Sequence, residues 1–513
     1  MLIRYRTRLF EWKNLNANDA NNGRQVRDHK RISRMFYKLY SRYSPIRGIR
    51  VEKCTGENFL KFLRNLKMRT WLIIVAAVAL SERVLLYLLC RPVAYNDTSS
   101  YRRLAEAILD GWTRYDGTRM PGYPAFLALI GSDERVYAAQ LALGFLTTLF
   151  FFYLGWRVSG KGWFGALAAL AHTLNLQQLF FEANLITESL TTFFIAASLA
   201  GMAWLLLTEG KRPLWQIVAV ALASGLTGGL ATMTRALFIF LPFWAAFFLL
   251  IFAQHLLGWR TAARKIRWSA ALAAGLTGLL IIAAWVNFIH QRFGIWSVTT
   301  MSGYHLVQHT GLFFEYVPDE YAAIRDTYIQ YRQARVAQTG APGNAIWDAI
   351  PALQEVSGLG FIQLSNLLAK ISIQLILEHP GLYLRSVLQG WLWFWKAPVY
   401  WSPEAFTNPL ISMALAGKVA FARGGMVFAN IAFIFGSLAL VSKKVRLALK
   451  MDVFLWLVIS AVWLTSILQT LLDHGDNPRF LVPVQSLVVF LVLWWGLQIT
   501  RQFVKGKHEN ISA

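Results

Sequence analysis

Residues 186–207 read ITESLTTFFIAASLAGMAWLLL, and Glu188 is the one charged residue in this stretch. A helix needs about 20 mostly apolar residues to cross the hydrocarbon core of a bilayer. The stretch therefore predicts a membrane-spanning helix that carries a carboxylate in its first turn.

Apolar stretches of similar length recur along the chain. We expect ten of them to be spans: 71–92, 136–157, 163–182, 186–207, 214–233, 236–256, 268–290, 424–442, 453–472 and 480–499. The Trp-rich stretch 381–401 is apolar too, and we expect it to be re-entrant or interfacial, or else paired with a second crossing near 404–421. The pattern predicts an all-α polytopic membrane protein of about 10–12 transmembrane helices.

The composition agrees with a membrane protein and excludes a soluble enzyme. Hydrophobic residues make up 56% of the 513 residues, charged residues only 15%, and the mean hydropathy is +0.41. A soluble domain needs more polar surface than this. The 21 Trp suit the aromatic belts of a membrane protein. The two cysteines, Cys54 and Cys90, provide neither a disulfide framework nor a zinc cluster.

The net charge of +24 is concentrated near the start of the chain. Residues 1–70 hold 18 Lys and Arg against 5 Asp and Glu. Such a segment is either an arm that binds nucleic acid or lipid, or a basic extension that fixes the orientation of the protein. We favour a disordered cytoplasmic tail and expect no nucleic acid partner. Met68, directly before the first span, leaves a later chain start open.

Lys and Arg cluster after every second span, which puts both termini in the cytoplasm by the positive-inside rule. The chain then divides into five parts. They are a tail (1–70), a transmembrane module with its outer loop 93–135 (71–290), a mostly helical outer segment with interfacial helices (291–423), the last transmembrane helices (424–500) and a cytoplasmic end (501–513).

The first outer loop carries Asp97 directly after the membrane exit, and helical spacing follows from Tyr101 onward. Asp97, with Thr98 and Ser99, is either an N-cap of an amphipathic helix or a carboxylate that accepts a proton. Arg119 then opens a turn with Tyr123 between two prolines. Its guanidinium suits a phosphate, although a headgroup anchor is the alternative.

Three more charged residues stand where spans meet the outer side. Glu188 opens the fourth span, where a carboxylate is either functional or simply favoured by the positive helix end. Arg235 follows the fifth span, and Arg479 lies in the last outer turn, LLDHGDNPRFLVPV. Both arginines stand where a lipid phosphate would lie.

Motifs for soluble cofactors are absent from the sequence. It contains no Gly-rich loop with GK[ST], no HExxH, no nucleophile elbow and no His/Cys metal spacing. A donor group would therefore have to arrive through the membrane.

Taken in order, Asp97 with Tyr101 and Leu104, then Gly111, then the turn 119–124, resemble the first loop of the GT-C glycosyltransferases. The similarity is to the dolichyl-phosphate-mannose protein mannosyltransferases (family 39) and the bacterial aminoarabinose transferases. LITESLTTFF resembles the second acidic signature of these families, and Thr234-Arg235 and NPRFLVPV resemble two further landmarks. The resemblance covers roughly 70–500, but about 300–420 carries no motif of the families.

The resemblance implies a GT-C-like bundle and an inverting transfer of a sugar from a polyprenyl phosphate to a glycan, lipid or protein acceptor. It implies catalytic roles for Asp97 and Glu188 and donor-phosphate binding by Arg119, Arg235 and Arg479. No metal ligand is implied, although some GT-C enzymes use a divalent metal. We expect the bacterial inner (plasma) membrane, with the active site on the periplasmic side.

Three residues are expected as substrate contacts: Tyr123, Tyr304 and His305. Two other classes of function stay open. A transporter or flippase of lipid-linked sugars predicts charges facing each other in mid-membrane, where Glu82 and Arg83 lie. A polysaccharide polymerase or ligase would depend on arginines more than on carboxylates.

Overall fold

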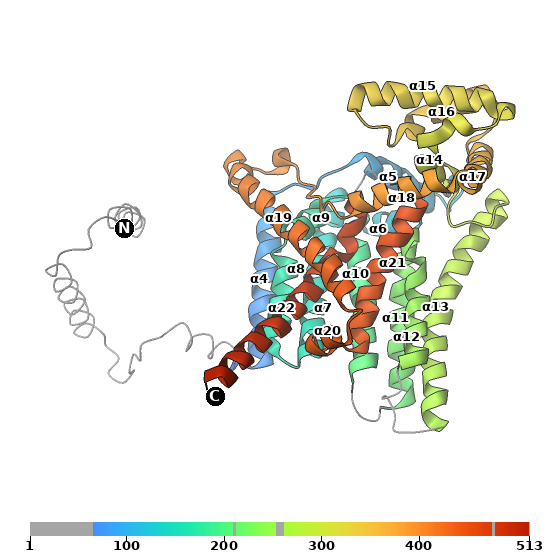
Figure 1. Ribbon diagram of the computed structural model, residues 1–513. Coiled ribbons are helices and arrows are strands. Elements are labelled where there is room, and N and C mark those ends of the chain that lie inside the picture. Colours follow the sequence, from blue (N-terminus) through green and yellow to red (C-terminus); the bar gives the residue numbers. More distant parts are fainter. Residues whose placement is uncertain (1–64, 209–211, 253–260, 475–477, 512–513) are drawn as a thin grey trace. The chain divides into compact units, whose positions relative to one another are not determined.

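The computed structural model describes residues 65–208, 212–252, 261–474 and 478–511 (Figure 1). These residues form helices joined by short turns, with two isolated β-bridges and no strand among them. The predicted basic tail lies, up to residue 64, outside the described residues. The described chain runs from α4 (Met68–Leu89) to α22 (Val482–Ile511).

Nine of the described helices are long and apolar enough to cross a membrane. They are α4, α7 (Asp133–Ser159), α10 (Glu188–Leu207), α11 (Leu214–Thr234), α13 (Thr261–Phe293), α17 (Phe361–Glu378), α19 (Pro409–Ala439), α21 (Val453–Leu472) and α22. The prediction of an all-α polytopic membrane protein is confirmed.

The predicted span 163–182 is two short helices rather than one. α8 (Gly162–Thr173) ends before Asn175, and α9 (Leu176–Ala183) begins after it. The Asn175 side chain accepts a hydrogen bond from the backbone N–H of Gln177, 3.0 Å away, which is an N-cap that starts a new helix. Helix breaks inside a membrane bundle are tolerated where neighbouring segments satisfy the backbone.

Other boundaries also differ from the predictions. The stretch 236–256 begins as a 3₁₀ turn, η1 (Ala236–Phe240), and continues as α12 (Leu241–Phe252). The stretch 381–401 contributes α18 (Pro380–Phe394), which lies across the upper end of the bundle in Figure 1, as an interfacial segment would. The predicted span 424–442 is the second half of a longer helix, α19, which begins at Pro409.

α10 lies inside the bundle. It packs against α7, α11, α21 and α22, and 14 of its 20 residues are buried. Small residues permit helices to approach one another closely in the bundle. At Gly225 of α11, for example, an added Cβ would collide with the backbone of Ala274 in α13. Such small-residue contacts are how membrane helices pack tightly without a hydrophobic driving force between them.

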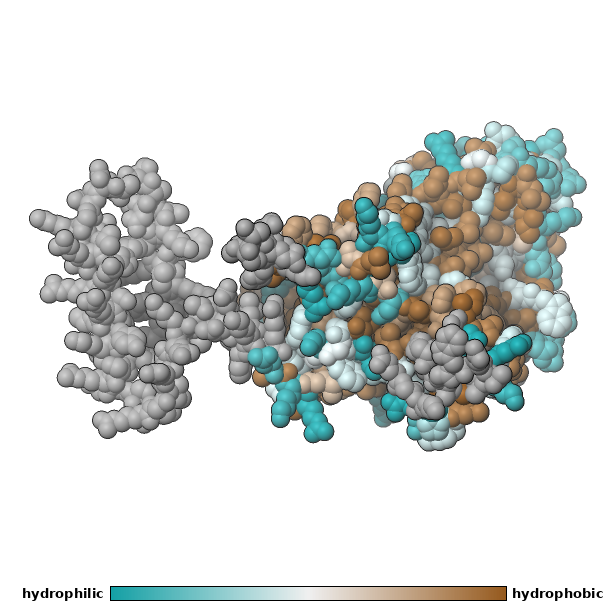
Figure 2. All heavy atoms as spheres, turned by 60° about the horizontal axis from the view of Figure 1, so that its bottom comes forward, coloured by the Kyte–Doolittle hydropathy of each residue, from teal (hydrophilic) through white to brown (hydrophobic). Residues whose placement is uncertain are grey.

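Hydrophobic side chains cover much of the bundle surface, seen in brown in Figure 2. They include Leu80 of α4, Leu280 of α13 and Phe421 of α19, all of which are exposed. Exposed apolar surface on this scale suits contact with lipid tails rather than water.

A group of helices covers one end of the bundle, the upper end in Figure 1, which we call the site end. It comprises α5 (Asn96–Leu109), α6 (Gly122–Ile130), α14 (Ser302–Thr310), α15 (Ala322–Thr339), α16 (Ala345–Ser357), α17 and α18. α14 to α17 share a hydrophobic core of their own. Although long enough to cross a membrane, α17 packs there against α14. α20 (Lys443–Ala448) lies at the opposite end, where α4 begins and α22 finishes (Figure 1).

α6 is held to the end of α11 by a glycine. A Cβ at Gly122 would lie 2.6 Å from the carbonyl oxygen of Met233 and 2.9 Å from the amide nitrogen of Thr234. Because both contacts are to backbone, they cannot be relieved by a side-chain rotation. The absence of a side chain at Gly122 therefore sets the distance between the loop before α6 and the residues that follow α11.

We expect Gly122→Ala to destabilise the protein by about 1–3 kcal/mol, the usual cost of overpacking. The unfolding temperature of the detergent-solubilised protein should fall. It can be followed with a thiol-reactive dye in a Cys54→Ala background, where the dye reports exposure of the buried Cys90.

Gly417→Ala is the matched control, since a Cβ at this α19 position would meet nothing within 4 Å. A helical Gly→Ala change at an open position should leave the unfolding temperature equal or slightly raised. Equal unfolding temperatures for Gly122→Ala and wild type would contradict the packing argument.

Candidate functional site

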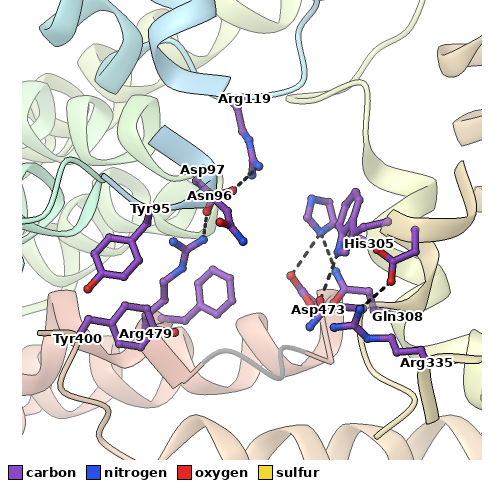
Figure 3. Close-up of a pocket in the computed structure, with 14 residues that line it drawn as sticks. Tyr95, Asn96, Asp97, Arg119, His305, Gln308, Arg335, Tyr400, Asp473 and Arg479 are labelled. Carbon is purple, nitrogen blue, oxygen red and sulfur yellow. Dashed lines mark hydrogen bonds and ion pairs between the residues drawn. The ribbon is translucent and has the colours of Figure 1, made fainter. Parts of the chain in front are cut away.

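Asp97 lies in the first turn of α5, but it does not cap the helix. The backbone N–H of Tyr95 donates instead to Thr98 Oγ1, 2.9 Å away, and the Thr98 hydroxyl donates to the carbonyl of Leu185 at 2.9 Å. The N-cap interpretation of Asp97 is therefore wrong, because Thr98 supplies the capping oxygen. The Asp97 carboxylate points away from the helix backbone and toward two arginines (Figure 3).

The start of α5 is fixed next to the start of α10 by backbone hydrogen bonds. Val93 N–H donates to Ala183 C=O, and Leu185 N–H donates to Val93 C=O, both at 2.9 Å. These bonds lie where α9 ends at Ala183 and before α10 begins at Glu188. Asp97 and Glu188 consequently lie at one place although they belong to different helices.

Arg119 approaches Asp97 from the loop between α5 and α6. Its Nη2 donates to Asp97 Oδ1 at 2.7 Å, and its guanidinium lies 5.7 Å from the ring centre of Tyr101. The Tyr115 hydroxyl donates to the Arg119 carbonyl at 3.0 Å and holds the loop in place. α5 itself stops at Leu109 and is followed by Gly111 in the left-handed region.

Glu188 and Arg235 form a buried ion pair. Glu188 is the first residue of α10 and has no exposed surface, and Arg235 directly follows α11. Arg235 Nη2 donates to Glu188 Oε1 at 2.8 Å, and Arg235 Nε donates to Thr187 Oγ1 at 2.9 Å. A carboxylate in the first turn is also favoured by the positive end of the helix dipole.

Arg479 joins the two carboxylates. Its Nη2 donates to Asp97 Oδ2, and its Nε lies 3.6 Å from Glu188 Oε1. We call this set the ion cluster: Asp97, Arg119, Glu188, Arg235 and Arg479. Three guanidinium groups face two carboxylates, so the ion cluster carries a net charge of +1. All five members were predicted as catalytic or phosphate-binding residues, and the structure brings all five together.

The ion cluster keeps Asp97 ionised. Burial alone would raise the pKa of the Asp97 carboxyl, but the charges of Arg479 and Arg119 outweigh it and lower the pKa to about 2. A carboxylate held in this way is a weak base until the arginines are drawn elsewhere.

Two cavities meet at the ion cluster. The polar cavity, about 640 Å³, is lined on one side by Tyr95, Asn96, Asp97, Arg119 and Tyr400, and on the other by α14–α16 (Figure 3). The apolar cavity, about 380 Å³, includes Leu237, Ile239, Val298, Leu306 and Leu472. Arg119, His305, Asp473, Arg479 and Phe480 line both.

Arg235 lines the apolar cavity, and one N–H group of its guanidinium makes no hydrogen bond to the described residues. Its Nη1 is buried and has no hydrogen-bond partner among the residues that the structure describes. The guanidinium also lies 4.7 Å from the ring centre of Phe480. A buried N–H without a partner is costly, so this position suits an anionic ligand.

Of the three predicted substrate contacts, only His305 lines the cavities. Its Nδ1 lies 3.3 Å from Asp473 Oδ2. Tyr123 and Tyr304 are wholly buried, with hydroxyls that donate to Gln140 Oε1 and to Phe361 C=O. Both tyrosines therefore hold helices together rather than face a cavity.

Sequence reasoning missed the far wall of the polar cavity. Gln308, Arg335, Asn344, Trp347 and Asp348 lie there. The signal was local: the segment GAPGN ends in a turn, and a Trp and an Asp follow within one helical turn. The resemblance carried no motif in this region, so it did not indicate these residues.

Glu82 and Arg83 do not face each other. Arg83 is buried and pairs with Glu182 at 2.6 Å, while the Thr173 hydroxyl donates to Glu82 and accepts from Arg83, at 2.7 Å each. Glu182 thus lies inside the bundle rather than at the outer face, packed directly against Gly144. None of these residues lines either cavity, which favours a structural role.

Within the described part of the chain, no group of three or more His, Cys, Asp or Glu side chains could hold a metal ion. Comparisons with protein-family models, curated proteins and solved structures find no match to this chain. The resemblance to the GT-C glycosyltransferases therefore stays a prediction from its residues, and the fold and site define an integral membrane protein with a charged site at one end of its bundle.

Removing the Glu188 charge should destabilise the protein strongly. Glu188→Gln leaves Arg235 buried without its closest counter-charge, which costs about 3–5 kcal/mol. The unfolding temperature should drop more than for Asp97→Asn, because Asp97 is partly exposed. Glu188→Gln with Arg235→Gln should recover part of the loss, and a double variant no better than the single one would contradict the pairing.

Acid should weaken the wild type more than Asp97→Asn. The folded pKa of Asp97, about 2, lies below the value of about 3.9 for an unfolded aspartate. Its ionised form therefore stabilises the fold above about pH 4, and this contribution is lost as the pH falls toward 2.

Tryptophan fluorescence during heating, from pH 5 to pH 2, measures this effect. Other carboxylates titrate in both proteins, so the difference between the two unfolding temperatures is the informative quantity, and we expect it to shrink below pH 4. Parallel curves would show that Asp97 is not held by the arginines.

Proposed function

We propose that this chain is a membrane glycosyltransferase of the GT-C type. It moves a sugar from a polyprenyl-phosphate donor to an acceptor at the site end, with inversion at the sugar carbon. The single observation that carries the proposal is the position of Asp97, a carboxylate between arginines at the junction of an apolar and a polar cavity.

The two cavities match the two halves of such a donor. The apolar cavity suits the first isoprene units, since Leu237, Ile239 and Leu472 line it. The ion cluster contributes Arg119, Arg235 and Arg479 to the lining of the same cavity, and its net positive charge and the N–H of Arg235 suit the phosphate. The sugar then extends into the polar cavity past Asp97.

The phosphate and Asp97 compete for the same arginines. When phosphate oxygens engage Arg119 and Arg479, these guanidinium groups make weaker contacts with the carboxylate. The pKa of Asp97 then rises from its low resting value toward that of an ordinary aspartate, and the carboxylate becomes a better base. Donor binding thus prepares the base, which keeps Asp97 inert while the donor is absent.

The transfer itself is a single displacement. The acceptor hydroxyl gives its proton to Asp97 as its oxygen bonds to the anomeric carbon. The bond from that carbon to the phosphate oxygen breaks, and polyprenyl phosphate leaves with the electron pair. Arginines held in position stabilise the charge that grows on this oxygen without reorganising.

Glu188 acts as a positioning residue in this scheme. It has no exposed surface and cannot reach an acceptor, but it holds Arg235 and contacts Arg479. The assisting role expected for it from the opposite wall becomes an indirect one, exerted through the two arginines.

The distribution of basic residues indicates how the protein is oriented in the membrane. Basic residues cluster at the end opposite to the site. They are Arg157 in the last turn of α7, Lys161 just after α7, and Lys443, Lys444 and Arg446 in α20. By the positive-inside rule that end is cytoplasmic. We propose the bacterial inner membrane, with both termini cytoplasmic and the site end in the periplasm.

A transfer assay tests the proposal. The full chain in nanodiscs is incubated with polyprenyl-phosphate sugars, labelled in the sugar, and with a membrane extract as source of acceptors. Wild type should move label to an acceptor, and Asp97→Asn should lower the rate by about 10²–10⁴-fold, the contribution of a general base.

Asp110→Asn is the matched control, because Asp110 is an exposed aspartate of the same loop that pairs with Arg114. It should transfer like wild type. Full activity of Asp97→Asn would favour a polymerase or ligase that uses arginines alone. The absence of transfer from any donor by folded wild type would reject the enzyme and favour flipping of lipid-linked sugars, measured in vesicles.

A further inference from the structure

The polar cavity has a second wall, opposite Asp97, made by α14, α15 and α16 (Figure 3). We call it the far wall and define it as Gln308, Arg335, Asn344, Trp347 and Asp348. We propose that the far wall is the acceptor subsite and that the acceptor is an uncharged carbohydrate. This inference rests on the proposed function, since it names the substrate of the same site.

Trp347 provides an apolar platform in the far wall. It lies in the first turn of α16, and its Nε1 donates to Asn344 Oδ1 at 3.3 Å. Its ring also meets the His305 ring edge to face, with centres 5.5 Å apart. The indole is therefore held in place while part of it lines the cavity. A rigid aromatic ring suits the apolar face of a sugar.

The backbone of Asn344, at the start of α16, has an unusual conformation. Its φ of 64° lies in the left-handed region, which residues other than glycine seldom adopt. This conformation starts α16 abruptly and brings Asn344, Trp347 and Asp348 together at the cavity. Unusual backbone conformations of this kind often occur where a ligand is held.

The charges in the polar cavity balance. Asp97, Asp348 and Asp473 are matched by Arg119, Arg335 and Arg479. In the far wall the guanidinium of Arg335 already donates to Asp348, 2.7 Å away. A polyphosphate or a polycation would find no excess of opposite charge there. Planar amide, carboxylate and guanidinium groups suit the hydroxyls of a neutral sugar, which both donate and accept.

The cavities also argue against a lipid acceptor. The apolar cavity adjoins the ion cluster, and the proposed function fills it with the donor chain. The far wall presents one aromatic ring among polar groups, so it gives a second acyl or prenyl chain little apolar surface. The polar cavity, about 640 Å³, is within the range of roughly 300–1,000 Å³ found for small-molecule pockets.

Glycan binding tests the inference without any transfer reaction. The full chain in nanodiscs, with a fluorescent tag at its C-terminus, is applied to an array of neutral, sialylated and phosphorylated oligosaccharides. Wild type should bind neutral oligosaccharides. Trp347→Ala should weaken this binding about tenfold, the loss expected for one stacked ring, and Trp347→Phe should weaken it less.

Trp296→Ala is the matched control, because Trp296 is an exposed Trp that lines neither cavity. It should bind like wild type. If Trp347→Ala does not fold, Arg335→Gln with Asp348→Asn alters the same wall at an exposed ion pair and should also weaken binding.

Three results would overturn the inference: no binding to neutral oligosaccharides, binding to acidic ones alone, or equal binding by wild type and the far-wall variants. The proposed function fails separately. Neutral glycan bound through Trp347 by a protein that transfers no sugar would keep the subsite and reject the glycosyltransferase.

Discussion

A buried carboxylate that needs counter-charges organises this protein. Glu188 has no exposed surface, and Arg235 and Arg479 approach it from two other parts of the chain. Because an unpaired charge inside a membrane bundle is so costly, the starts of α10 and α22 and the end of α11 must meet. Asp97 and Arg119 are attached to this centre through Arg479. The polar and apolar cavities lie beside this group of charges.

A backbone attachment at the end of α9 gives the ion cluster its place. Val93 pairs with the backbone of Ala183 and Leu185, between α9 and α10. The first loop thereby reaches the start of α10, and Asp97 lies beside Arg479. Gly122 adds the second attachment, from α6 to the end of α11. Two local features, a pair of backbone hydrogen bonds and a glycine, thus bring distant segments to one site.

Asp97 and two arginines neutralise one another. The Asp97 carboxylate pairs with Arg119 and Arg479, and its own pKa is lowered in return. In the function we propose, the donor phosphate would compete with Asp97 for these arginines. With a lipid phosphate on one side and a carbohydrate on the far wall, the two proposed substrates would meet at Asp97.

The sequence by itself determined the membrane-spanning pattern, because hydropathy over about 20 residues is a local property. It also indicated all five members of the ion cluster, since a charge close to the end of an apolar stretch is conspicuous and Arg119 opens a proline-rich turn in the first loop. Only the tertiary structure decided how they pair: Asp97 and Arg479 are 382 residues apart. It alone placed Tyr123 and Tyr304 in the core, split the 163–182 span and brought Trp347 opposite Asp97, because these outcomes depend on packing between segments that share no sequence pattern.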